Sequence, residues 1–179
     1  MTNRAGGAVL LLGLDCAGKS TVLRSLLGED LMDVSPTLGF DIRSFAWALA
    51  DGRPELALDV WDVGGQETIR AYWRNYFEET DGLVWVVDSA DVERLELCAQ
   101  TLRQVLGEER LLGASLLILA NKQDLGGLSV DAIEAIIKPK ELGARHCAIM
   151  PCSAVTGQGV REAMEWLVAD VADRVFVKD

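Results

Sequence analysis

The sequence is poor in several features that mark other classes of protein. It contains one histidine and four cysteines in 179 residues, and its 17 basic residues face 28 acidic ones, a formal net charge of −11. The cysteines show no paired zinc spacing and are too few for a disulfide framework. The acidic excess argues against a nucleic-acid partner, because phosphate backbones recruit basic surfaces. We therefore expect a protein of a reducing, cytoplasmic compartment.

Long hydrophobic runs are also missing. Apolar stretches such as 9–12 and 83–87 fall far short of the roughly 18 to 20 residues that cross a bilayer. Thr2 stands where myristoylation requires a glycine, and residues 177–179 contain no cysteine for prenylation. We expect no direct membrane anchor and, because repeats and linker-like segments are lacking, a single domain over residues 1–179.

Short β-rich apolar runs alternate with stretches of helical periodicity, as they do in successive βα units. The runs cover residues 8–14, 56–61, 83–88, 115–120 and about 147–152. Helical spacing links Leu95, Cys98, Leu102 and Val105, and again Val160, Met164, Leu167, Val171 and Val175. Between residues 40 and 62, two strand-like runs flank Asp51-Gly52, a dipeptide that favours a tight hairpin turn. The pattern predicts an α/β fold whose mostly parallel sheet has an antiparallel hairpin at one edge.

One motif predicts a phosphate-binding loop. The sequence from 13 to 20 reads Gly13-Leu14-Asp15-Cys16-Ala17-Gly18-Lys19-Ser20, which fits G-x-x-x-x-G-K-[ST] between a strand and a helical pattern. Glycines let backbone N–H groups point at phosphate oxygens, and the following helix N-terminus adds partial positive charge. Lys19 would reach the β- and γ-phosphates, and Ser20 would offer a hydroxyl to Mg²⁺. The expected nucleotide contacts here are Gly13, Asp15, Cys16, Ala17, Gly18, Lys19, Ser20 and Thr21.

A second motif predicts the base. Asn121, Lys122 and Asp124 follow a predicted strand, at the edge where α/β sheets bind ligands. A carboxylate only accepts hydrogen bonds, and guanine offers it N1–H and a 2-amino group, whereas adenine does not. Rejection of ATP should be strong, because ATP would leave buried polar groups unpaired. Ser153 and Ala154, after the last strand, complete the predicted base site.

Two further segments are suited to the third phosphate. Asp62 ends a strand and can hold a metal ion through water, Gly65 can donate its backbone N–H to the γ-phosphate, and Gln66 can orient an attacking water. Thr37, in an upstream loop, offers a hydroxyl to Mg²⁺ and a backbone N–H to the γ-phosphate. The predicted metal ligands are therefore Ser20, Thr37 and Asp62, and the predicted catalytic residues are Lys19, Gly65 and Gln66.

With these segments in register, the chain resembles an ADP-ribosylation-factor-like small GTPase over essentially its whole length. The resemblance rests on Gly13-Leu14-Asp15, Pro36-Thr37-Leu38-Gly39-Phe40, Trp61-Asp62-Val63-Gly64-Gly65-Gln66, Tyr72-Trp73-Arg74-Asn75-Tyr76-Phe77 and Asn121-Lys122-Gln123-Asp124. The runs at 81–91 and 152–157 are most similar to the type-two branch of that family.

The resemblance implies a P-loop GTPase fold, with a six-stranded, mostly parallel sheet, one antiparallel edge hairpin and five flanking helices. It implies GTP, GDP and Mg²⁺ as ligands, nucleotide-gated loops at Thr37 and Gln66, and an effector face that includes Phe40, Trp61 and Tyr76. The implied partners of this monomer are an activating protein, an exchange factor, a tubulin-folding cofactor and carriers of lipidated cargo.

Two departures from the family pattern modify these expectations. Family members usually begin with an amphipathic helix that docks in the GDP form, and this sequence has only a few residues before its first strand. The resemblance therefore does not extend to membrane coupling through such a helix. The segment 37–62 is several residues longer than the family's usual hairpin, with 46–55 carrying the excess, so effector contacts at the hairpin are expected to differ.

The motifs favour a switch that hydrolyses GTP slowly, because no arginine lies between Glu29 and Thr37 to stabilise the transition state in cis. An alternative is a GTP-binding scaffold or adaptor with negligible hydrolysis, against which Gln66 weighs. A nucleotide kinase or ATPase is disfavoured by Asp124. Cys16, near a helix N-terminus, could also be a reactive thiol or simply a small residue that fits the loop.

Overall fold

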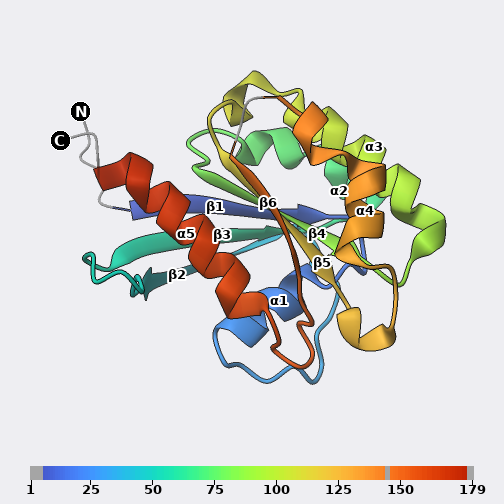
Figure 1. Ribbon diagram of the computed structural model, residues 1–179, viewed down its shortest axis with the longest axis horizontal. Helices are drawn as coiled ribbons and strands as arrows, with labels where there is room; N and C mark the ends of the chain where they lie inside the picture. The colour runs from blue at the N-terminus through green and yellow to red at the C-terminus, as the bar shows by residue number, and fades with distance from the viewer. Residues whose placement is uncertain (1–5, 144–145, 177–179) are drawn as a thin grey trace.

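The architecture is a six-stranded sheet between two helical layers (Figure 1). The structure is a computed structural model that describes residues 6–143 and 146–176. Its strands are β1 (Gly6–Gly13), β2 (Phe40–Trp47), β3 (Leu56–Val63), β4 (Gly82–Asp88), β5 (Ser115–Asn121) and β6 (Cys147–Pro151). They lie in the order β2-β3-β1-β4-β5-β6, in which β2 and β3 form the antiparallel edge pair and the other pairs are parallel. The predicted fold class is confirmed.

Five α-helices occur in the described part of the chain, as expected. They are α1 (Lys19–Leu26), α2 (Glu67–Arg70), α3 (Leu95–Leu106), α4 (Val130–Ile137) and α5 (Val160–Phe176). Short 3₁₀ segments include η1 (Trp73–Tyr76) and η2 (Val92–Arg94), on either side of β4, with η3 (Glu109–Leu111), η4 (Gln123–Leu125) and η5 (Pro139–Glu141) further along. The predicted helix faces are correct, since the spaced residues of α3 are all buried and those of α5 are buried up to Val171.

Alternation along the buried strands divides the core between the two faces of the sheet. Val9 and Leu11 of β1 pack with α1 and α5, whereas Leu10 and Leu12 of the same strand pack with α3 and α4. Both faces of β1 are therefore apolar, as expected for a central parallel strand. In Figure 1, α5 runs across one face of the sheet, with α1 on the same side.

The edge hairpin is confirmed, but the tight turn predicted at Asp51-Gly52 is wrong. The ladder ends at the pair Trp47 and Leu56, so residues 48–55 form an eight-residue connection. This connection docks on α5: Glu165 accepts hydrogen bonds from Trp47 Nε1 at 2.6 Å and from the Ala50 backbone N–H at 2.8 Å. Because these contacts satisfy polar groups of the loop, the chain does not need to close in two residues.

The functional loops meet at one edge of the sheet. Parallel strands β1, β3, β5 and β6 all end there, so the segments that follow them are brought together. The segment before β2 reaches the same edge, because Phe40, the first residue of this antiparallel strand, pairs with Val63, the last of β3.

The chain ends, residues 1–5 and 177–179, lie outside the described residues. The expectation of no lipid anchor rests on Thr2 and on those last three positions, and it stays a prediction. Within the two described ranges, no helix is both long enough and apolar enough to cross a bilayer.

Candidate nucleotide site

The phosphate loop links β1 to α1, and Lys19 is the first residue of the helix. The Lys19 side chain is buried and its Nζ donates to the carbonyls of Gly13 at 3.1 Å and Leu14 at 2.8 Å. Burial lowers the pKa of Lys19 to about 8, although the carboxylates of Asp62 and Asp15 favour its charged form. An anionic ligand would offset this desolvation, which is the situation expected of a phosphate-binding lysine.

Gly18 and Gly65 are required by close approach. Gly18 has φ of +99°, and a Cβ there would lie 2.5 Å from Asn121 Nδ2. A Cβ on Gly65 would collide with the Gly13 carbonyl oxygen and with Lys19 Nζ. The segment after β3 therefore lies directly against the phosphate loop, and only a glycine allows that approach.

Three oxygen-bearing side chains converge beside Lys19. Ser20 Oγ lies 2.8 Å from Thr37 Oγ1 and donates to Asp62 Oδ2 at 2.5 Å, and Thr37 Oγ1 lies 3.5 Å from the same carboxylate oxygen. Burial raises the pKa of Asp62, with the hydrogen bond from Ser20 and the charge of Lys19 opposing the shift. Asp62 Oδ1 is buried without a hydrogen-bond partner among the described residues.

This cluster fits a magnesium ion. Hydroxyl and carboxylate oxygens are hard donors, and Mg²⁺ takes few protein ligands when phosphates and water complete its shell. A cation would also satisfy the orphaned, poorly solvated carboxylate oxygen of Asp62. The structure thus brings together the three predicted metal ligands Ser20, Thr37 and Asp62.

The base loop after β5 is fastened to its neighbours. Asn121 donates from Nδ2 to the Ala17 carbonyl at 3.0 Å and accepts from the Ala154 N–H at 3.0 Å. Lys122 Nζ donates to the Cys16 carbonyl at 2.6 Å, which ties it to the phosphate loop as well. Asp124 is exposed, and its Oδ1 accepts from Ser153 Oγ at 2.8 Å.

The segments around Thr37 and Gly65 also contact each other. The Gly64 N–H donates to the Gly39 carbonyl at 2.8 Å, and Trp73 Nε1 donates to the Gly64 carbonyl at 2.9 Å. The two segments are therefore joined at Gly64, which is also bonded to η1.

A cavity of about 400 Å³ lies between these loops. Its lining includes the predicted residues Asp15, Cys16, Gly18, Lys19, Ser20, Thr21, Thr37, Gly65, Gln66 and Lys122. Of the remaining predicted residues, Gly13 and Asp62 are bonded to the lining residues Lys19 and Ser20. Ala17, Asn121, Asp124, Ser153 and Ala154 lie outside the lining, where Asn121 is bonded to Ala17 and Ala154, and Asp124 to Ser153. A volume of this size is ordinary for a small-molecule site.

Sequence reasoning missed five residues that line the cavity: Val34, Ser35, Pro36, Gly64 and Val155. Residues 34–36 directly precede Thr37, Gly64 precedes Gly65 and Val155 follows Ala154, so their proximity to predicted residues was the available signal. Arg70 and Arg94, which bind Asp15, were also missed. They are 55 and 79 residues away from it in the chain, and no local motif marks them.

An aromatic cluster lies next to the segment that carries Gly65. The rings of Phe40, Trp61 and Tyr76 are 5.4–5.7 Å apart between centroids, and Phe40 is 52% exposed. Leu38 and Ile42, two residues before and two residues after Phe40, are exposed as well. Such an apolar surface is typical of a protein-binding site.

These features define a P-loop nucleotide-binding protein: a phosphate loop, an oxygen cluster that fits Mg²⁺, and a base loop with an acceptor carboxylate. The family model of the ADP-ribosylation factor family matches residues 2–171. The chain therefore belongs to the ADP-ribosylation factor family, as the motifs predicted, and is a GTP-binding switch of the small GTPase class.

Individual relatives agree with this assignment. ADP-ribosylation factor-like protein 2 of Arabidopsis thaliana is 50% identical over 173 residues, which are 96% of this chain and 90% of the relative. The protein of the same name from Drosophila melanogaster is 51% identical over 172 residues, with the same coverage. Among solved structures, the Arl6 BBS3 small GTPase of Trypanosoma brucei, with the nucleotide analogue GppNp bound, has a TM-score of 0.83 at 25% identity and covers 94% of this chain and 98% of its own.

Proposed function

We propose that this chain binds GTP and GDP with Mg²⁺ in the cavity between the phosphate loop and residues 34–37 and 64–66, and hydrolyses GTP slowly. The observation that carries the proposal is the convergence of Lys19, the Ser20 and Thr37 hydroxyls, and Gly65 on one cavity. Lys19 would bind the β- and γ-phosphates, and the backbone N–H of Gly65 would bind the γ-phosphate. Ser20, Thr37 and Asp62 would hold Mg²⁺, which when bound neutralises charge on the phosphates.

Base selection is assigned to Asp124. Its Oδ1 accepts a hydrogen bond from Ser153 Oγ, and the carboxylate would accept further hydrogen bonds from the N1–H and 2-amino groups of guanine. Asn121 and Lys122 brace the base loop against the phosphate loop, so the two halves of the nucleotide site are fixed relative to each other.

Hydrolysis is assigned to water oriented by Gln66, which lines the cavity at the N-terminus of α2. The described part of the chain places no arginine on the cavity lining to supply transition-state charge, so turnover at or below about 10⁻² s⁻¹ is expected without an activating protein.

A Gln66→Leu substitution tests this assignment. It should slow GTP loss by roughly ten- to a hundredfold, because leucine cannot orient water, while GTP affinity stays close to that of the wild type. Single-turnover hydrolysis measured by chromatography of the nucleotides gives the rate. Gln104→Leu, at an exposed site on α3, is the matched control. Equal rates in wild type and Gln66→Leu would instead favour the GTP-binding scaffold or adaptor.

The cellular role is proposed on the resemblance to the type-two branch of the family. We propose that the GTP form recruits a tubulin-folding cofactor and carriers of lipidated cargo in the cytoplasm, with the chain acting as a monomer. The exposed aromatic cluster of Phe40, Trp61 and Tyr76 supports a protein effector, since it adjoins the segments that would contact the third phosphate. Pull-down with each candidate partner, comparing the GDP form with the form loaded with a non-hydrolysable GTP analogue, tests this role.

A further inference from the structure

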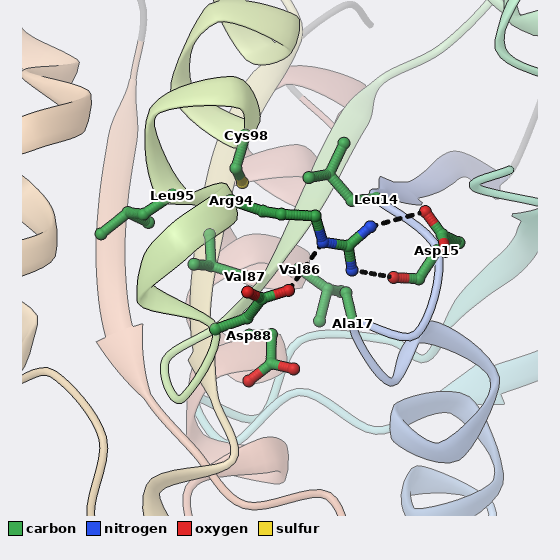
Figure 2. Close-up of a pocket in the computed structure, with 10 residues that line it drawn as sticks. Leu14, Asp15, Ala17, Val86, Val87, Asp88, Arg94, Leu95 and Cys98 are labelled. Carbon is green, nitrogen blue, oxygen red and sulfur yellow. Dashed lines mark hydrogen bonds and ion pairs between the residues drawn. The ribbon is translucent and has the colours of Figure 1, made fainter. Parts of the chain in front are cut away.

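Arg94, in η2, binds the phosphate loop from the side of α3. Its Nη1 donates to Asp15 Oδ1 at 2.8 Å and its Nη2 donates to the Asp15 carbonyl at 2.9 Å (Figure 2). Its Nε donates to Asp91 Oδ2 at 2.7 Å, so the guanidinium is held from both sides. Arg94 thereby fixes both the backbone and the carboxylate of Asp15.

Arg70, at the end of α2, reaches the same carboxylate from the other direction. Its Nη2 lies 3.3 Å from Asp15 Oδ1, and its Nε donates to the Gly65 carbonyl at 2.9 Å. One carboxylate oxygen is therefore shared by arginines from two elements. The Gly65 peptide is connected to the start of α3 through the side chains of Arg70, Asp15 and Arg94.

These contacts of Arg70 and Arg94 with Asp15, here called the bridge, also compensate the negative charge of Asp15 at the rim of the cavity. Asp15 lines that cavity, where an unpaired carboxylate would repel phosphate. Burial acts to raise the pKa of Asp15, but the hydrogen bond and charge of Arg94, together with the charge of Arg70, hold it below its ordinary value. The side chains of Arg70 and Arg94 are 17% and 34% exposed, so the ion pairs are partly shielded from solvent.

We propose that Arg94 is a positioning residue for the triphosphate-bound state. It holds the Asp15 carboxylate where Arg70 can dock on it, and Arg70 in turn holds the Gly65 peptide against the phosphate loop. The inference rests on the proposed function, in which the Gly65 N–H contacts the third phosphate. Because GDP lacks that phosphate, loss of the bridge should weaken binding of the triphosphate more than binding of GDP.

The test measures dissociation constants for Mg²⁺–GDP and for Mg²⁺ with a non-hydrolysable GTP analogue. Arg94→Ala should raise the ratio of analogue to GDP dissociation constants by about tenfold, the usual cost of a lost charged hydrogen bond. Arg70→Ala should shift the ratio similarly, and the double variant by less than the product of the two, because both act through Asp15. Arg103→Ala is the control, since Arg103 lies on α3 and contacts Glu96 and the Ile136 carbonyl instead.

Arg94→Lys and the melting temperature of each GDP-bound variant keep the test independent of folding. Lysine keeps the positive charge but lacks the planar guanidinium, so the ratio of dissociation constants in Arg94→Lys should fall between those of the wild type and Arg94→Ala. An equal loss for both nucleotides would assign Arg94 a merely structural role and overturn the inference. If Arg94→Ala did not fold, an unchanged ratio of the two dissociation constants in both Arg70→Ala and Arg94→Lys would also overturn the inference. A wild type that bound neither nucleotide would overturn the proposed function as well, whereas normal wild-type binding with an unchanged ratio would overturn the bridge alone.

Discussion

Among the side chains of the nucleotide site, Asp124 has the most specific proposed role, which is selection of the base. Its carboxylate accepts from Ser153 at 2.8 Å and would accept from two donors of guanine. Asp124→Asn should replace an acceptor by a donor, which suits xanthine, whose 2-position carries a carbonyl oxygen. We expect affinity for GTP to fall by about a hundredfold or more and affinity for xanthosine triphosphate to rise. Competition against labelled GDP measures both.

The control for that exchange is Asp131→Asn, at an exposed position of α4. It should leave both affinities unchanged. A preference for GTP that survives in Asp124→Asn would contradict the assignment of base selection to this carboxylate.

The cysteines differ in their environments. Burial raises the pKa of Cys152 to about 12, and burial also raises the pKa of Cys98, while Cys16 lies exposed on the lining of the cavity. Since the thiolate is the nucleophile, a raised pKa leaves little reactive thiolate at pH 8. Iodoacetamide at pH 8 should therefore modify Cys16 first, and Mg²⁺–GDP should slow that reaction. Mass spectrometry of the peptides, with urea-unfolded protein as control, measures the rates. Modification of Cys152 as fast as Cys16 would refute this ordering.

At the scale of elements, the long connection between β2 and β3 is anchored to α5. Trp47 is buried, donates to Glu165, and has the Arg161 guanidinium 4.6 Å from its ring centroid. Two hydrogen bonds, from the Trp47 indole and the Ala50 N–H, thus depend on one carboxylate.

Glu165→Ala should lower the free energy of unfolding by roughly 1–3 kcal/mol, because it leaves the buried indole N–H of Trp47 without its acceptor. Urea unfolding of the GDP-bound protein measures the change. Glu162→Ala, at an exposed position one turn earlier on α5, should change stability by less than about 0.5 kcal/mol. Equal effects from the two substitutions would mean that the docking contributes nothing specific.

On the scale of the whole molecule, the proposed ligands should stabilise the fold by mass action. A bound cation would compensate the unpartnered Asp62 oxygen, and a bound phosphate would compensate the buried charge of Lys19. At about one hundred times the dissociation constant, Mg²⁺–GDP should add about 2.7 kcal/mol, or roughly 5–10 °C in melting temperature for a chain of this length. Differential scanning fluorimetry measures the shift. ATP should give none, and EDTA should reduce the shift given by GDP; an equal shift with ATP would count against guanine selection.

Much of this molecule could be predicted from sequence because its signals are local. Residues 13–20 carry a complete motif between a strand and a helix, and the apolar runs predict five of the strands within about two residues at each end. The prediction of a tight hairpin turn was wrong because Asp51-Gly52 signals only a local preference, whereas the loop is also bonded to Glu165, over one hundred residues away in the chain. The Arg70 and Arg94 contacts could not be predicted for the same reason: which arginines meet Asp15 depends on the packing of α2 and η2.

Strand β2 joins two surfaces that are distant in space. Its first residue, Phe40, belongs to the exposed aromatic cluster, and its last, Trp47, is pinned to α5. Eight residues of extended chain span about 26 Å, and every one of them is paired with β3. The contact of Trp47 with the C-terminal helix and the patch around Phe40 are therefore the two ends of one fully paired strand, with no loop between them.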